Sequence, residues 1–136
     1  MLDGLAKIPS KLTRLLGRFA IARLDPGDEV PGWAWSGAFA SVSRTTTELS
    51  IVCDERAVPA GVVAERGWRA FAVAGPMDLS TVGVLASIAQ PLAEAGIALF
   101  AISTFDTDII LVREGTAGEA VIALRDAGHE VGEEAG

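Results

Sequence analysis

The segment Ser103–Asp108 holds the residue types that could do chemistry in this chain of 136 residues. It reads Ser-Thr-Phe-Asp-Thr-Asp, so it carries three hydroxyls and two carboxylates, and apolar runs precede and follow it. A tight connection between two strands needs only a short polar turn. The two carboxylates therefore indicate a further role, and Asp108 is a candidate partner for a positively charged group of a bound molecule.

The stretch Asp78–Gly83 could supply the opposite kind of partner. A helix is expected to begin here, at about Thr81, and the free amides at a helix N-terminus bind anions. Gly83 falls in the first turn of this predicted helix, where it lowers helix propensity by about 1 kcal/mol relative to alanine. Because glycine has no Cβ, close approach of a ligand or of a neighbouring strand would explain it. A free amino acid would find a partner for its carboxylate in these amides and one for its ammonium in Asp108.

Residues 68–131 show the order of elements that would position these groups. The predicted strands are 68–74, 97–103, 108–112 and 129–131, and the predicted helices are 81–95 and 116–127. The resulting order, β-α-β-β-α-β, is ferredoxin-like and belongs to the α+β class, with two helices on one face of an antiparallel sheet. In that order the first and third strands are neighbours. The loop after the first strand and the end of the third can therefore lie close, with Thr104 and Phe105 between them.

Two local signals refine the predicted helices. Pro91 lies inside the first helix, removes one backbone hydrogen bond and predicts a kink. Thr116 and Glu119 have the spacing of a capping box, in which each side chain bonds to the backbone amide of the other residue.

The N-terminal part, 1–66, reads as a strand-rich half, followed by a second domain at 67–132 and a frayed acidic tail at 133–136. Leu12–Leu16 and Phe19–Leu24 predict a hairpin around Gly17. Cys53 ends another strand-like run, and we expect it to be a buried, unreactive thiol.

Several competing interpretations remain. Asp78, Ser80 and Thr81 are ordinary helix-capping residues, and Asp106 and Asp108 could simply bond to turn amides. The two aspartates could also act as acid and base, or bind a cation, but the spacing lacks the further oxygen ligands of a calcium loop. His129 is the sole histidine and is expected at the surface or at a strand end, so a histidine-based triad or a multi-histidine metal site is not expected. No phosphate-binding or dinucleotide-binding fingerprint occurs, so we expect no cofactor.

Composition narrows the class of protein. The formal net charge of −7 disfavours contact with phosphate backbones, so nucleic-acid binding is not expected. No apolar run approaches the length that spans a bilayer, and the N-terminus lacks the layout of a signal peptide. With one cysteine, no internal disulfide can form. The expectation is a soluble cytoplasmic protein that contacts no membrane.

Four motifs resemble, in their order, the C-terminal unit of the tandem ACT-domain proteins of the CASTOR type. They are Gly75-Pro76-Met77-Asp78, then Pro91-Leu92-Ala93-Glu94-Ala95-Gly96-Ile97, then the segment from Ser103 to Asp108, then Leu111-Val112. The resemblance covers most of the chain. It implies two fused ACT-like halves that share sheets, the N-terminal one reduced.

The resemblance also implies a function. It points to a sensor or regulator without catalytic activity that binds a small molecule, most often an amino acid. By resemblance, the residues that would touch the ligand are Asp108, Thr104, Phe105, Gly83 and Val84, with Asp78 in the segment that opens the helix. ACT-like sheets tend to pair, and half of the residues are hydrophobic, so a homodimer is expected. The alternative is an interaction or dimerisation module whose ligand site no longer functions.

Overall fold

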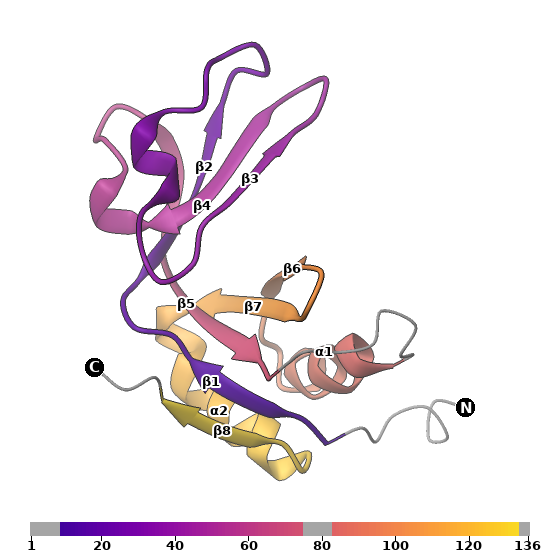
Figure 1. Cartoon of the computed structure of the whole chain (residues 1–136). Coiled ribbons are helices and arrows are strands. Elements are labelled where there is room, and N and C mark those ends of the chain that lie inside the picture. Colours follow the sequence, from indigo (N-terminus) through magenta and orange to yellow (C-terminus); the bar gives the residue numbers. More distant parts are fainter. Residues whose placement is uncertain (1–8, 75–82, 134–136) are drawn as a thin grey trace. The chain divides into compact units, whose positions relative to one another are not determined.

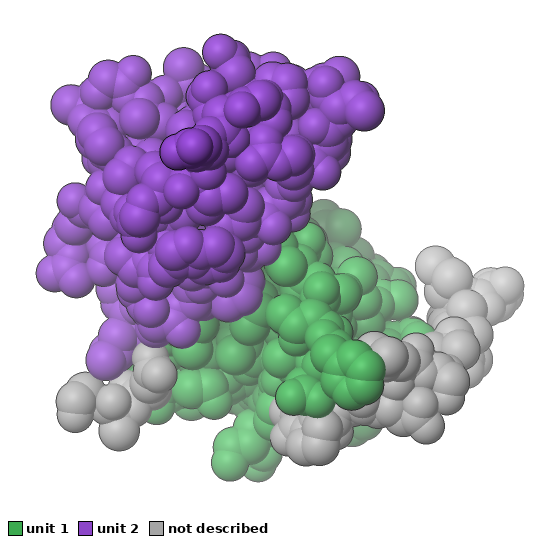
Figure 2. All heavy atoms as spheres, turned by 45° about the horizontal axis from the view of Figure 1, so that its top comes forward, with its two compact units in different colours: residues 1–15, 69–136 green, residues 16–68 purple. Residues whose placement is uncertain are grey.

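The computed structural model describes residues 9–74 and 83–133, and it divides into two compact units. Unit 1 is formed by the described residues of 1–15 and 69–136, and unit 2 is Leu16–Trp68 (Figure 2). Unit 2 is therefore inserted, in sequence, between two separate pieces of unit 1.

Unit 1 contains the predicted ferredoxin-like order of elements, which confirms the α+β class (Figure 1). The elements are β5 (Val63–Val73), α1 (Val84–Glu94), β6 (Leu99–Ser103), β7 (Asp108–Arg113), α2 (Ala117–Asp126) and β8 (Glu130–Glu133). The first part of β5, up to Trp68, belongs to unit 2.

An additional strand, β1 (Lys11–Arg14), completes the sheet of unit 1. It runs antiparallel to β5 and parallel to β8, and so separates these two strands (Figure 1). On the other side of β5 lies β7, which pairs in turn with β6. The strand order in this unit is therefore β8-β1-β5-β7-β6.

The hairpin predicted around Gly17 is wrong. β1 pairs with β5 and β8, whereas the following strand, β2 (Phe19–Leu24), pairs with β4 and β5. The physical reason is burial, because Leu12 is fully buried in the core of unit 1, opposite Val73 and Val131 in the register. The predicted N-terminal half, 1–66, included β1, which the structure places in unit 1. Of the predicted tail, Glu133 is the last residue of β8, and 134–136 lie outside the described residues.

Both helices pack into one core with the sheet of unit 1. From α1 the buried residues include Val84, Ile88 and Leu92, which recur every four residues and so lie on one face. The α2 helix adds Ala117, Ala120 and Leu124, and the strands contribute Leu12, Phe71, Val73, Ile110, Val112 and Val131. Pro91 lies within α1 without ending it, and the predicted kink stays a prediction.

The predicted capping box at the start of α2 is wrong. A 3-10 turn, Glu114–Thr116, precedes the helix, and the Thr116 hydroxyl donates to the Arg113 carbonyl oxygen at 2.9 Å. Its side chain therefore makes no capping hydrogen bond to the helix.

Unit 2 is a sheet with strand order β3-β4-β2-β5, in which β3 is Ser41–Arg44 and β4 is Leu49–Asp54. Two short 3-10 segments, Gly32–Trp35 and Glu55–Ala57, accompany it, and residues 16–68 contain no α-helix. The strand-rich character predicted for this part of the chain is confirmed. Its core consists of Ala20, Ala22, Ala34, Leu49, Ile51, Cys53 and Val58.

Candidate functional site

The turn between β6 and β7 carries most of the predicted site residues. The Thr104 amide donates to the Thr107 carbonyl oxygen at 2.7 Å, and the Thr107 amide donates to the Thr104 hydroxyl at 3.2 Å. These bonds close a tight polar turn, as expected of threonine near a hairpin end. Phe105 stands at its tip with 80% of its surface exposed, which is unusual for a large aromatic side chain.

Asp108 is the buried polar residue of this region. Only 6% of its surface is exposed, and its Oδ1 accepts a hydrogen bond of 2.6 Å from the Ser103 hydroxyl. Ser103 and Asp108 are also opposite each other in the β6–β7 register. The structure thus holds a carboxyl group in a largely desolvated position, oriented by a neighbouring hydroxyl.

Thr107 connects this hairpin to β5. Its hydroxyl donates to the carbonyl oxygen of Val73, the last residue of β5. The first and third strands of the ferredoxin-like order are therefore neighbours, as predicted. However, it is the beginning of the third strand that meets the end of the first, and not its end. Asp108 consequently lies at the end of the sheet from which the chain continues toward α1.

The start of α1 differs from the prediction. The helix begins at Val84, and Gly83 precedes it with a φ of +93°, a conformation that glycine adopts without the steric cost that a Cβ brings. This backbone geometry explains the glycine without any ligand. The Gly83 carbonyl oxygen accepts the Ser87 amide at 2.9 Å. Val84 is 8% exposed and packs in the core of unit 1, and Asp78 lies outside the described residues.

His129, expected at the surface or at a strand end, directly precedes β8, but it is only 5% exposed and so is not at the surface. Its Nδ1 accepts the Ser10 amide at 3.0 Å, and its Nε2 lies 2.8 Å from the Ser87 carbonyl oxygen. Pro91 has no N–H to offer that carbonyl in the usual i to i+4 helical bond, so the imidazole takes the place of the missing donor. The sequence did contain one signal: Pro91 lies four residues after Ser87 in the predicted helix, so the Ser87 carbonyl needs a donor from elsewhere. The sequence could not show that a histidine from before β8 reaches this position.

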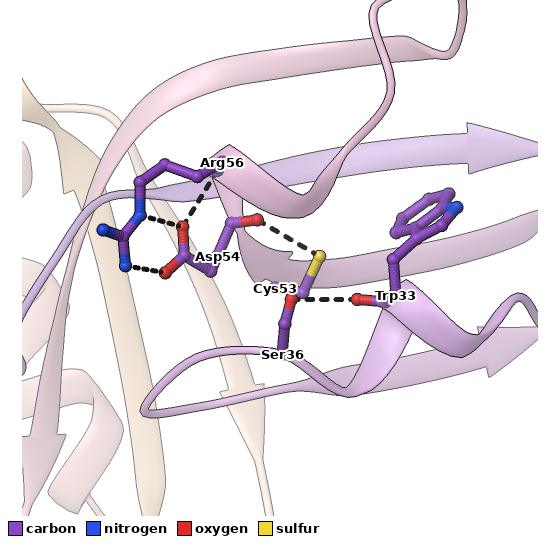
Figure 3. Close-up of polar contacts among 5 residues, drawn as sticks. All are labelled: Trp33, Ser36, Cys53, Asp54 and Arg56. Carbon is purple, nitrogen blue, oxygen red and sulfur yellow. Dashed lines mark hydrogen bonds and ion pairs between the residues drawn. The ribbon is translucent and has the colours of Figure 1, made fainter.

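Unit 2 holds a separate polar cluster next to Cys53 (Figure 3). The Arg56 guanidinium donates to both carboxylate oxygens of Asp54, at 3.2 and 2.8 Å, and the Arg56 amide donates to Oδ1 at 2.9 Å. Cys53 is fully buried, as predicted, and burial raises the pKa of its thiol. The raised pKa leaves little thiolate at neutral pH, so this cluster lacks the activated nucleophile that catalysis would need.

The Asp54–Arg56 pair predicts a specific pH dependence. The hydrogen bonds from Arg56 lower the pKa of Asp54 below the ordinary value of 3.8. The pair therefore stabilises the fold at pH values above the ordinary pKa of Asp54, and this stabilisation is lost as the pH falls through the lowered pKa. An Arg56→Gln variant should therefore be less stable than the wild type at neutral pH, and the difference should shrink on acidification toward pH 2. Urea denaturation of both proteins at a series of pH values measures it. A difference that grows on acidification would contradict this account.

No cluster of three or more metal-ligating side chains occurs among residues 9–74 and 83–133. Over the same ranges, no helix is long and apolar enough to cross a membrane.

Comparison with known proteins shows which proteins this chain is related to. A family model described as an ACT domain matches residues 63–126, and a second model, described as an N-terminal domain, matches 17–61. Residues 63–126 thus form an ACT domain. Protein Atu0741 from Agobacterium tumefaciens, known from its crystal structure, is 38% identical with a TM-score of 0.90, over 96% of this chain and 97% of that one. This chain belongs to the same family.

More distant solved structures share the fold. A Vibrio cholerae protein of unknown function is 20% identical with a TM-score of 0.71, over 88% of this chain and 90% of that one. The ligand-free regulatory subunit of aspartate kinase from Thermus thermophilus is 17% identical with a TM-score of 0.59, over 85% and 96%. No curated protein sequence matches the chain significantly.

Proposed function

We propose that this ACT-domain protein is a non-catalytic regulator or sensor that binds a small molecule, and that the ligand is a free amino acid. Two findings support the proposal: the match to the ACT family model, and a fold shared with a protein described as the regulatory subunit of aspartate kinase. The observation that carries it is Asp108, a buried carboxyl group beside the end of β5.

In this proposal each predicted site residue has a role. The Asp108 carboxylate pairs with the ammonium group of the ligand, since charge-assisted hydrogen bonds are the strong ones in a desolvated site. Thr104 and the exposed ring of Phe105 contact the ligand from the β6–β7 turn. Backbone amides of the segment from Asp78 to Val84 bind its carboxylate, and Gly83 permits close approach.

The proposal includes the wider arrangement implied by the resemblance. The two parts predicted at 1–66 and 67–132 would be ACT-like halves of a tandem protein of the CASTOR type, and the protein would function as a homodimer in the cytoplasm. The second family model, matched at 17–61, supports a distinct N-terminal module.

An Asp108→Asn variant tests the site. The substitution keeps the shape and removes the charge, and loss of a charge-assisted hydrogen bond of about 1.5–3 kcal/mol should weaken amino-acid binding about tenfold to a hundredfold. A thermal-shift screen against the twenty amino acids identifies the ligand, because a ligand at about a hundred times its Kd should stabilise the wild type by about 2.7 kcal/mol. Calorimetric titration then compares the affinities of variant and wild type.

Asp106→Asn is the matched control, because Asp106 is an exposed residue of the same turn. It should bind the ligand as the wild type does. Equal affinity in Asp108→Asn and wild type would remove Asp108 from the site.

One observation favours a second function, an interaction or dimerisation module without a ligand. The Ser103 hydroxyl already satisfies Oδ1 of Asp108, so this carboxyl group could serve only to hold the hairpin. In that case no amino acid would shift the melting temperature of the wild type. Asp108→Asn would lower the melting temperature equally whether or not an amino acid is added.

A further inference from the structure

A hollow in unit 1 lies between α2 and the strands β1 and β8, and none of the residues proposed above for the amino acid lines it. Its volume is about 310 Å³, which is at the lower end of the range of small-molecule sites, roughly 300–1,000 Å³. Its walls are formed by Arg14 of β1, by Gly118, Val121, Ile122 and Arg125 of α2, and by the last three residues of β8, Val131 to Glu133.

The polar side of this hollow is positively charged. Its lining contains two guanidinium groups, of Arg14 and Arg125, and one carboxylate, of Glu133, although acidic residues outnumber basic ones by 18 to 11 in the whole chain. Arg125 is fixed in place, because its Nη2 donates to the Val131 carbonyl oxygen at 2.7 Å. The lining of the hollow therefore has a positive net charge, whereas the whole chain is negatively charged. A positively charged hollow favours an anion.

The guanidinium of Arg14 is only partly used. Its Nη2 pairs with Oε1 of Glu133, whereas its Nε is buried and has no hydrogen-bond partner in the described part of the chain. A guanidinium binds a carboxylate best through two parallel N–H···O bonds. A ligand carboxylate that took the place of Glu133 could engage both nitrogens.

The remaining walls are apolar or open. A Cβ added at Gly118 or at Gly132 would meet no atom within 4 Å, so the space in front of both residues is empty of protein. Val121 and Val131 supply apolar surface, and Ile122 is 62% exposed despite its size. A ligand with a short hydrocarbon part would cover this surface.

From these observations we propose that the hollow is a second binding site, for a small monocarboxylate with a short apolar chain. The carboxylate binds the Nε and Nη2 of Arg14 and is attracted by Arg125, and the hydrocarbon part lies on Val121 and Ile122. Glu133 holds Arg14 in position while the site is empty and competes with the ligand for it.

Titration of residues 1–136 with butyrate, followed through the backbone amide resonances of Gly118 and Gly132, tests the proposal. Butyrate lacks an ammonium group, so the result is independent of the proposed amino-acid site. Arg14→Gln should weaken butyrate binding about tenfold or more, since a charge-assisted bond is lost. Glu133→Gln should strengthen it, because the competing carboxylate is removed. Both variants break the same ion pair, so a merely structural role would move the two affinities in the same direction.

Gly118→Leu blocks the hollow from within α2. Leucine is a better helix former than glycine, so the fold should be retained while butyrate binding is abolished. Gly115→Leu is the matched control, because Gly115 also has open space around it but does not line the hollow. Butylammonium at the same concentrations should not shift either amide. Unchanged butyrate affinity in Gly118→Leu, or weaker binding in Glu133→Gln, would overturn the proposal.

Discussion

A leucine at position 129 should lower the free energy of unfolding of unit 1 by about 2–5 kcal/mol. Leucine fills a similar space but offers neither a donor nor an acceptor, so the Ser10 amide and the Ser87 carbonyl both lose the imidazole. A buried backbone group that loses its partner costs about 1–3 kcal/mol, and the Ser10 amide, which is only part-buried, should contribute less than the Ser87 carbonyl. Because Ser10 precedes β1 and Ser87 lies in α1, the loss should loosen three parts of the unit together. Urea denaturation gives the free energy, and hydrogen exchange of the α1 amides shows where the loss falls.

Glu130→Leu is the matched control, since Glu130 is the exposed neighbour of His129 in sequence. It should change stability by no more than about 0.5 kcal/mol. Two conservative variants separate the two hydrogen bonds. Asparagine at 129 can keep an acceptor near the Ser10 amide, and glutamine can keep a donor near the Ser87 carbonyl, so each should lose less than leucine. If His129→Leu is as stable as the wild type, the bridge contributes nothing.

The second large effect is expected in unit 2, where Gly37→Ala should cost about 3 kcal/mol. Gly37 has a φ of +100°, and an added Cβ would lie 3.0 Å from the Cβ and 3.1 Å from the amide nitrogen of Asp54. The left-handed conformation alone costs a residue with a Cβ about 1–2 kcal/mol. The contact adds to this, because the Asp54 amide is held by a hydrogen bond of 3.1 Å to the Ser36 carbonyl and cannot move freely.

Gly67→Ala separates these two contributions. Gly67 has a similar φ of +79°, but an added Cβ would meet nothing within 4 Å. This variant should therefore show only the conformational cost, about 1–2 kcal/mol. Thermal and urea denaturation of both variants measure the difference. Equal losses in the two proteins would mean that unit 2 absorbs the contact with Asp54 without cost.

Local patterns were sufficient to predict the order of elements from β5 to β8 in unit 1. The apolar residues of α1 recur at helical spacing, and Ser103–Asp108 separates two apolar strands as a turn should. These features depend on residues close in sequence, so the sequence contains the information needed to predict them. The neighbouring position of β5 and β7 followed from the order itself.

Contacts between distant residues could not be predicted in this way. Leu12 looked like part of a hairpin, but its partners are Val73 and Val131, which are far along the chain. His129 was expected at the surface or at a strand end, and nothing nearby in sequence indicates its burial or its contact with Ser87. In each case the position is decided by burial against a surface that exists only after folding.

The same limit applies to the candidate site. The turn residues and Asp108 could be predicted as a polar group at a strand end, and the structure shows how Ser103 and Thr107 connect them to the sheet. The assignment of Gly83 to a helical turn was wrong. A glycine in a sequence can mean either close approach of a ligand or a positive φ, and the sequence alone does not distinguish the two. Val84 is explained by the core of unit 1.

The placement of β1 has a consequence for how the protein folds. During synthesis this strand leaves the ribosome before both strands that it pairs with, β5 and β8. Leu12 therefore stays outside its core until β8, which ends at Glu133, has been translated. Pairing β1 with β5 closes a long loop that contains unit 2, and the entropic cost of closing a loop grows only slowly with its length. The insertion of β1 is therefore limited by its rate and not by this cost. Until β1 is in place, β5 and β8 each present an unpaired edge in unit 1, and such edges are open to pairing with another chain.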